Sequence, residues 1–187
     1  NHLSHPYDIE ETLYERNIEG LAPIKAVRPI YCNVERTPPK VTEKDAPEPI
    51  KQLLSSIVVT EYCEAGSVLE YRQKQLSHGN MLDLCIAACD IGVKMAQTLT
   101  RLEENNIYFS DSKLTNWLVK EGQLLIADTK SFLRSAEGRY FEGIKENEYR
   151  SVLSTRPFFH PQINDTDGFS VSRVHAYLLG LNLYSIL

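Results

Sequence analysis

The chain has 187 residues, of which 42% are hydrophobic and 24% charged, which is enough apolar material for one compact domain with its own core. Its formal net charge of −5 disfavours nucleic acid as the main partner, because basic surfaces bind phosphate-rich partners. No apolar run reaches the length of a membrane-spanning helix, and the opening residues lack the pattern of a signal peptide.

The first part of the chain is predicted to form one helix and two strands. Residues 7–18 favour a helix because acidic side chains stand near its amino-terminal end and apolar residues recur along one face. Residues 24–32 are strand-like, and the β-branched run within residues 57–62 predicts a buried strand. Between them, residues 35–50 combine prolines with charges of both signs, which predicts a flexible surface insertion.

The middle of the chain is predicted to contain a short helix at residues 68–75 and a long one at residues 80–104. In the long helix, apolar residues recur at spacings of three and four: Leu82, Ile86, Cys89, Val93, Ala96, Leu99 and Leu102. Ala87, Ala88 and Gly92 would let a neighbouring element approach closely. We therefore expect this helix to lie at the centre of the fold.

The four cysteines are too few for a disulfide scaffold in a chain of this length. Two of them, Cys85 and Cys89, are four residues apart in the long helix, which is one spacing for a metal-binding pair. No second Cys or His pair has matching spacing. The sequence therefore favours buried reduced thiols, and with them a reducing, cytoplasmic compartment.

The last third of the chain is predicted to contain a β-hairpin and a final helix. Residues 117–119 and 124–127 are short apolar strands, separated by a turn that contains Gly122. A long irregular stretch is expected from residue 130 to about residue 171, followed by an apolar helix over residues 174–187. That helix ends without Gly, Pro or a basic last turn, and the chain begins without Met, so we expect a fragment.

The chemistry is concentrated around the predicted hairpin. A hairpin brings its two ends together, so Asn116 and Asp128 are expected to be neighbours, and their oxygens suit Mg²⁺. Asp111 precedes them and is placed to orient a hydroxyl or accept its proton, and Lys113 can neutralise a phosphoryl group. The alternative is that these four residues are ordinary loop and cap residues.

In order and spacing these residues resemble the catalytic loop H-R-D-x-K-x-x-N, the hairpin and the D-F-G motif of protein kinases. The resemblance implies that Asp111 is the catalytic aspartate and that Asn116 and Asp128 hold the metal, with Lys113 beside the transferred group. Residues 58–67 are similar to the fifth strand and hinge of kinases. That similarity implies a gatekeeper at Thr60 and contacts to adenine from the backbones of Glu61 and Cys63.

Two further segments resemble the same family. Residues 155–162 are similar to the end of an activation segment, and residues 175–184 to the central helix of the C-lobe. The helix at residues 7–18 then corresponds to the C-helix. Glu11 is the expected partner of the ATP-binding lysine, with Glu10 as the close alternative.

The resemblance implies an α+β, protein-kinase-like fold in a single partial domain that spans residues 1–187. Residues 1–66 would be the remnant of the N-lobe and hinge, with residues 35–50 inserted. Residues 67–187 would be the first part of a mainly helical C-lobe. The glycine-rich loop and the ATP-binding lysine of the family have no counterpart in this sequence.

Several motif positions depart from the family. Phe109 and Ser110 replace the His and Arg of H-R-D, and Phe109 is expected to fill the space of the lost His. Thr129 and Lys130 replace the Phe and Gly of D-F-G. His175 replaces the anchoring aspartate of the central helix, where we expect a structural role. Gln162 replaces the last Glu of the activation segment.

The expected function is ATP-dependent phosphoryl transfer to Ser or Thr of a protein substrate by the full-length protein, with ATP and Mg²⁺ as cofactors. Lys113 favours Ser/Thr over Tyr within this resemblance. The altered motifs leave two alternatives open: a pseudokinase that serves as a scaffold or nucleotide-gated interaction module, and an enzyme that modifies a small molecule or transfers another group from ATP. The motifs also resemble kinases that bacteria inject as effectors, for which the location would be the host cytosol.

Overall fold

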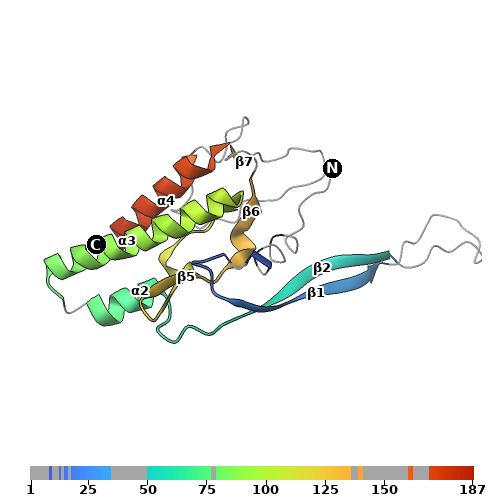
Figure 1. The fold of residues 1–187 in the computed structure, drawn as a ribbon, viewed down its shortest axis with the longest axis horizontal. Coiled ribbons are helices and arrows are strands. Elements are labelled where there is room, and N and C mark those ends of the chain that lie inside the picture. The colour runs from blue at the N-terminus through green and yellow to red at the C-terminus, as the bar shows by residue number, and fades with distance from the viewer. Residues whose placement is uncertain are drawn as a thin grey trace, which may run out of the picture.

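Helices and small antiparallel sheets together make up an α+β fold (Figure 1). The computed structural model of the chain describes residues 9, 13, 15–16, 18–34, 50–76, 79–135, 139–140, 160–161 and 169–187. Within these ranges every sheet has two strands, and each pair of strands is antiparallel. The α+β class predicted from the sequence is therefore confirmed.

Two long strands, β1 (Ile24–Val34) and β2 (Ile50–Thr60), form a ribbon that extends away from the helices (Figure 1). β-Branched residues near the end of β2 favour this extended backbone. Both predicted strands are present, although β2 begins at Ile50 rather than at residue 57. The prediction that residues 57–62 form a buried strand is wrong, because the side chains of Ile57 (52%) and Val59 (48%) are exposed. The rest of the predicted insertion, residues 35–49, lies outside the described residues.

The first predicted helix is described only in part. Ile9 and Leu13 are helical and almost fully buried in the main hydrophobic core. Their spacing of four residues places them on one face of a helix, as the apolar pattern predicted. Glu10 and Glu11 lie outside the described residues, so the choice between them as a lysine partner stays a prediction.

The two helices in the middle of the chain begin with side-chain caps. α2 (Val68–Tyr71) starts with a capping box, in which Ser67 Oγ accepts from the Glu70 amide at 3.3 Å and Glu70 Oε2 accepts from the Ser67 amide at 2.7 Å. It continues as a π-helical turn, η2 (Arg72–Leu76). α3 (Met81–Glu104) starts after Asn80, whose side chain accepts from the Asp83 amide at 3.0 Å.

The final helix, α4 (Val171–Ile186), packs along α3 (Figure 1). It begins three residues before the predicted start at residue 174. A Cβ atom added at Gly92 would lie 2.8 Å from the Leu183 side chain. The missing side chain at Gly92 therefore permits the close helix approach that the sequence predicted.

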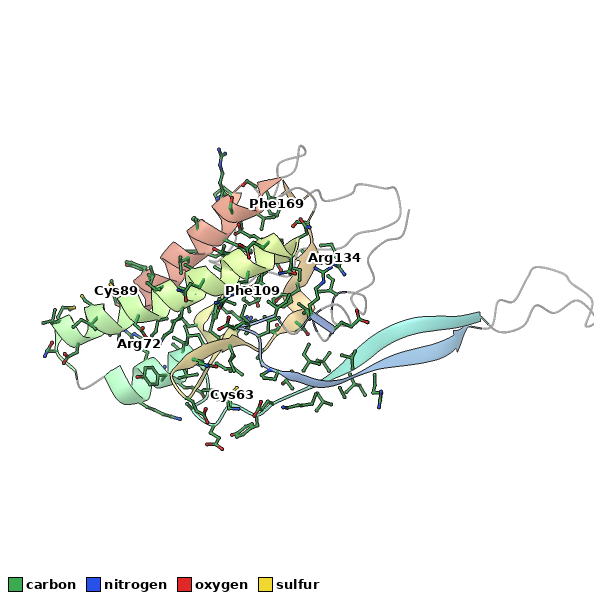
Figure 2. All side chains as sticks on the ribbon, in the orientation of Figure 1. Cys63, Arg72, Cys89, Phe109, Arg134 and Phe169 are labelled. Carbon is green, nitrogen blue, oxygen red and sulfur yellow. The ribbon has the colours of Figure 1, made fainter. Side chains whose placement is uncertain are left out.

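α3 turns a different face to the core from the one that its apolar spacing indicated. Its buried side chains include Ala88, Ile91, Met95, Leu99 and Leu102. The first part of the predicted stripe is exposed instead: Leu82 (67%), Ile86 (60%), Cys89 and Val93 (57%). The helix carries apolar residues on two faces, and only one of them packs against the rest of the described chain. The prediction of a buried thiol is wrong for Cys89, and Cys85 is half-buried (Figure 2).

The predicted hairpin consists of β4 (Trp117–Lys120) and β5 (Gln123–Ile126). Its two turn residues, Glu121 (φ 50°) and Gly122 (φ 76°), both have positive φ, as a type I′ turn requires. Trp117 is fully buried in the main core together with Phe109 and Phe132. Trp117, Phe109 and Phe132 thus anchor the hairpin and the strands beside it in the core.

Short strands border the stretch that the sequence predicted to be irregular. β3 (Ile107–Phe109) pairs with β6 (Phe132–Arg134), and β7 (Arg139–Tyr140) pairs with β8 (Phe169–Ser170). Two 3₁₀ turns, η3 (Leu114–Asn116) and η4 (Thr129–Ser131), lie immediately before β4 and β6. The hairpin β4–β5 therefore sits between two turns that carry polar residues.

Both edges of the hairpin are covered by segments from earlier in the chain. The Ile126 amide donates to Gly20 O at 3.0 Å, and the Val119 amide donates to Gly66 O at 2.9 Å. These bonds fix the hairpin relative to the start of β1 and to the segment that follows β2. None of the described helices has the length and apolar composition needed to cross a bilayer.

Candidate functional site

The segment from the end of β3 to the start of β4, residues 109–116, is largely buried. Ser110 and Ser112 are each 1% exposed, and Asp111 is 8% exposed. Ser110 donates through both its amide and its hydroxyl to Ser131 O, at 3.0 and 2.8 Å. Trp117 Nε1 donates to Ser112 Oγ at 3.1 Å. The loop is therefore fixed on both sides of Asp111 by hydrogen bonds that involve buried groups.

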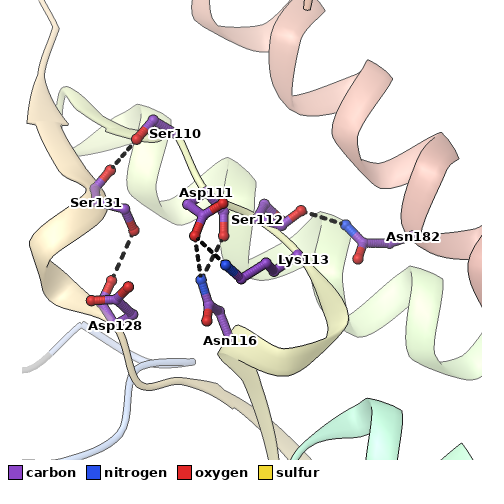
Figure 3. Close-up of polar contacts among 8 residues, drawn as sticks. All are labelled: Ser110, Asp111, Ser112, Lys113, Asn116, Asp128, Ser131 and Asn182. Carbon is purple, nitrogen blue, oxygen red and sulfur yellow. Dashed lines mark hydrogen bonds and ion pairs between the residues drawn. The ribbon is translucent and has the colours of Figure 1, made fainter. Parts of the chain in front are cut away.

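Three of the four predicted site residues meet at Asp111 (Figure 3). Asn116 Nδ2 donates to Asp111 O at 2.8 Å and to Asp111 Oδ2 at 3.1 Å. Lys113 Nζ lies 2.8 Å from the same Oδ2. A carboxylate this buried needs such partners, because an unpaired buried charge is costly. Asp111, Lys113 and Asn116 therefore form one bonded cluster.

The fourth predicted residue, Asp128, lies at the other end of the hairpin and next to Asn116. The Ala127 amide donates to Asn116 O at 3.2 Å, which places the two hairpin ends side by side. Ser131 Oγ donates to Asp128 O at 3.1 Å. Figure 3 shows Asp128 and Asn116 at the same end of the hairpin. The predicted proximity of Asn116 and Asp128 follows from the register of β4 with β5.

Two side chains with oxygen atoms, Asn116 and Asp128, stand at this end of the hairpin. The Asn116 amide nitrogen is directed at Asp111, and a cation bound here would meet the Asn116 amide oxygen and the Asp128 carboxylate. Oxygen ligands such as these suit Mg²⁺, which usually keeps several waters or phosphate oxygens. Among the described residues, no group of three or more His, Cys, Asp or Glu side chains is arranged to hold a metal ion.

A cleft of about 760 Å³ opens beside this cluster, and its volume lies within the usual range for small-molecule sites. It contains three further predicted residues, Thr60, Glu61 and Cys63. The residues that line it are Thr60, Glu61, Tyr62, Cys63, Gly66, Ser67, Leu69, Glu70, Thr115 and Leu118. Thr115 directly precedes Asn116, so the cleft adjoins the Asp111 cluster. Cys63 is 5% exposed, and this burial raises the pKa of its thiol.

An ion triplet that the sequence did not reveal lies at the edge of the cleft. The Glu61 carboxylate lies 2.5 Å from Lys120 Nζ, on β4, and 3.4 Å from Lys25 Nζ, on β1. The hydrogen bond from Lys120 is the largest cause of a lowered pKa for Glu61, and the charge of Lys120 adds to it. Glu61 thus links the ribbon to the hairpin. Such pairs between residues far apart in sequence leave no local pattern.

Replacing Glu61 with glutamine is expected to remove an acid-sensitive part of the stability. Because the folded-state pKa of Glu61 is lowered, its contribution is present above the unfolded-state pKa and is lost as the pH falls through the folded-state pKa. Wild type should therefore melt slightly higher than Glu61→Gln at neutral pH, and the difference should vanish in strong acid. Thermal melts over this pH range test the expectation, with Glu64→Gln, an exposed neighbour, as the control.

If Glu61→Gln and Glu64→Gln melt alike at every pH, the triplet contributes nothing to stability. Exposed ion pairs are weak in general, so a small difference is the expected result. The informative quantity is the pH at which the difference disappears, because it reports the folded-state pKa.

Two buried residues of α4, His175 and Asn182, also contact the loop. The Phe109 amide donates to His175 Nε2 at 3.1 Å, and Asn182 Nδ2 donates to Ser112 O at 2.8 Å. The sequence indicated a structural role for His175 and did not single out Asn182. Figure 2 shows Phe109 inside the packed part of the molecule. Its ring packs edge-to-face against Trp117 and Phe132, so Phe109 occupies an apolar space as expected.

Most of the predicted activation segment, including Thr155 and Gln162, lies outside the described residues. His160 is described, and its ring packs edge-to-face against Tyr177 of α4, with centroids 4.8 Å apart. This contact gives His160 a packing role against the final helix.

Comparison with protein-family models finds no match to this chain, and comparison with curated proteins finds no similar sequence. The geometry of the site is the evidence for its chemistry. That geometry joins a buried, paired aspartate, a second aspartate at the facing hairpin end and a cleft of ligand size.

Proposed function

We propose that the full-length protein transfers a phosphoryl group from ATP to a Ser or Thr hydroxyl of a protein substrate, using a protein-kinase-like fold. One observation carries the proposal: Asp111, Lys113 and Asn116 form a single bonded cluster, and Asp128 lies at the adjoining hairpin end. Phosphoryl transfer depends mainly on positioning and charge stabilisation, and a rigid polar cluster beside a cleft supplies both.

In this proposal each residue has one task. Asp111 orients the acceptor hydroxyl and takes its proton as the new oxygen–phosphorus bond forms and the bond to ADP breaks. Lys113 supplies positive charge for the transferred group. Asn116 and Asp128 would hold Mg²⁺, which neutralises phosphate charge when it is bound. The Lys113 contact to Asp111 would then give way to contacts with the substrate.

The cleft supports a nucleotide as the ligand. Residues 60–63 form one wall of it, and Leu118 adds apolar surface that a flat heterocycle could pack against. Thr115, the residue before Asn116, lines the same cleft. A ligand in the cleft therefore lies close to the residues that would hold its phosphates.

A second candidate is a binding module without turnover, in which the same shape serves as a scaffold or a nucleotide-gated switch. The favouring observation is that both Lys113 and Asn116 are directed at Asp111, so its carboxylate is already engaged. In this case the nucleotide would bind, but the carboxylate would not act as a base.

The test is thermal unfolding of the full-length protein with Mg²⁺ alone, with ATP and a chelator, and with Mg²⁺ and ATP together. A ligand present at about 100 times its Kd adds about 2.7 kcal/mol to the free energy of unfolding, so the melting temperature should rise by several degrees. Asp128→Asn keeps the shape of the side chain and removes its charge. It should abolish the part of the rise in melting temperature that depends on Mg²⁺. Asp90→Asn, the same change on the exposed face of α3, is the matched control.

Mass spectrometry of proteins incubated with the enzyme and Mg²⁺-ATP then identifies the transferred group and the residue that receives it. A phosphoryl-sized mass increase on Ser or Thr supports the first candidate. A thermal shift without any transfer supports the binding module. If the protein shows no thermal shift and transfers no group, both candidates are overturned.

A further inference from the structure

His175 is held in one protonation form by two partners on opposite sides of its ring. The Phe109 amide can only donate a hydrogen bond, so His175 Nε2, 3.1 Å away, must be an unprotonated acceptor. The ring proton is then on Nδ1, which lies 2.7 Å from Glu103 Oε1 and donates to it. The ring is 2% exposed, so water does not readily replace either partner.

Asn182, two helical turns further along α4, also bonds to the backbone of this loop. Seven residues separate it from His175, which places both side chains on the same face of the helix. Asn182 Nδ2 donates to Ser112 O at 2.8 Å and to Leu178 O at 2.8 Å. One helix face therefore holds the loop backbone at Phe109, before Asp111, and at Ser112, after it. Figure 3 shows Asn182 reaching this loop from α4.

We propose that Glu103 and His175 form a positioning pair for Asp111, an assignment that rests on the proposed phosphoryl transfer. Glu103 accepts the Nδ1 proton of His175, and His175 holds the Phe109 amide so that the Asp111 carboxylate faces the hairpin end. His175 touches neither substrate nor phosphate and acts only through the loop backbone. Small displacements of reacting groups are costly in rate, so loss of the pair should slow transfer without loosening the cleft.

A packing role for His175 makes different predictions from a hydrogen-bonding role. The Tyr108 ring lies 5.5 Å from the imidazole, so the ring does have an apolar neighbour. Leucine would satisfy such packing but would leave the Phe109 amide without an acceptor. Glutamine is less suited to packing, but its side-chain oxygen can reach the position of Nε2. His175→Leu and His175→Gln therefore distinguish a packing role from a hydrogen-bonding role.

The first readout is the tautomer, measured by NMR on the full-length protein with nitrogen-15-labelled histidine. Wild type should show His175 protonated on Nδ1. Glu103→Gln keeps the size but replaces the charged acceptor with a neutral one, so the His175 Nδ1 signal should shift while the Phe109 amide still favours the Nδ1-protonated tautomer. Protonation on Nε2 in wild type, or an unchanged Nδ1 signal in Glu103→Gln, would overturn the pair.

The second readout is hydrogen exchange and rate. In His175→Leu the Phe109 amide should exchange at least roughly tenfold faster, and kcat should fall by about 10²-fold with little change in KM for ATP. His175→Gln should restore most of the slow exchange of the Phe109 amide and most of kcat. His160→Gln, a histidine that packs on α4 through Tyr177, is the matched control and should behave like wild type.

Equal exchange and equal kcat in His175→Leu and wild type would overturn the proposal. If the protein transfers no phosphoryl group at all, the tautomer and the Phe109 exchange still decide whether the pair holds the loop. Failure of the positioning pair and failure of the proposed function are thus distinguishable.

Discussion

Replacing Asp111 with asparagine should lower the rate of phosphoryl transfer by about 10³-fold while Mg²⁺-ATP still raises the melting temperature. A positioned general base typically contributes about 10² to 10⁴-fold, and asparagine cannot take a proton from the acceptor hydroxyl. The change keeps the size of the side chain and one oxygen that can accept from Asn116 Nδ2. The loop should therefore keep its position, and the loss should fall on kcat.

Two measurements on the same variant make this expectation specific. Label transfer from ATP gives the rate, and the thermal shift with Mg²⁺-ATP gives binding. Asp90→Asn serves again as the matched substitution and should retain full rate. A rate for Asp111→Asn equal to that of wild type would remove Asp111 from the mechanism. Loss of the shift together with the rate would mean that Asp111 serves binding instead.

The part of the site that could be predicted from the sequence is the part encoded locally. Asn116 and Asp128 flank a hairpin whose turn, Glu121 and Gly122, fixes the register by its own backbone preference. Once that register is known, the two ends must lie together. Asp111 and Lys113 are only a few residues away, so their approach to Asn116 needs one short turn, η3.

Contacts between distant segments could not be predicted in the same way. His175 and Phe109 are 66 residues apart, and the group that His175 contacts is a backbone amide, which every non-proline residue has. Glu61 and Lys120 are 59 residues apart and look like ordinary surface charges in sequence. No residue type marks such partners before the fold brings them together.

The face that α3 buries could not be predicted because the helix is apolar on two sides. The stripe through Leu82, Ile86 and Val93 has good helical spacing but is exposed, while Ile91 and Met95 are buried. Periodicity detects an amphipathic helix, but it cannot choose between two apolar faces. β3 and β6 were missed for another reason: each has three residues, too few for an alternating pattern.

Replacing Trp117 with alanine should lower the free energy of unfolding by about 3–5 kcal/mol, the usual cost of removing a large buried aromatic side chain. Trp117 is fully buried in the main core, and its ring centroid lies 5.9 Å from that of Phe109. Its indole N–H also donates to Ser112 Oγ at 3.1 Å. The side chain therefore contacts both ends of the turn that carries Asp111, and its loss should leave a cavity beneath the site.

Urea unfolding followed by circular dichroism measures this loss, because Trp117 is the only tryptophan in the chain and fluorescence disappears with it. Trp117→Phe keeps a ring but leaves Ser112 Oγ without its indole donor, so it should lie between wild type and Trp117→Ala. Tyr184→Ala, at an 81% exposed aromatic on α4, should change the free energy of unfolding by less than about 0.5 kcal/mol. If Trp117→Ala is as stable as Tyr184→Ala, the loop does not depend on the core beneath it. The rigid positioning on which the proposed phosphoryl transfer relies would then lose its physical basis.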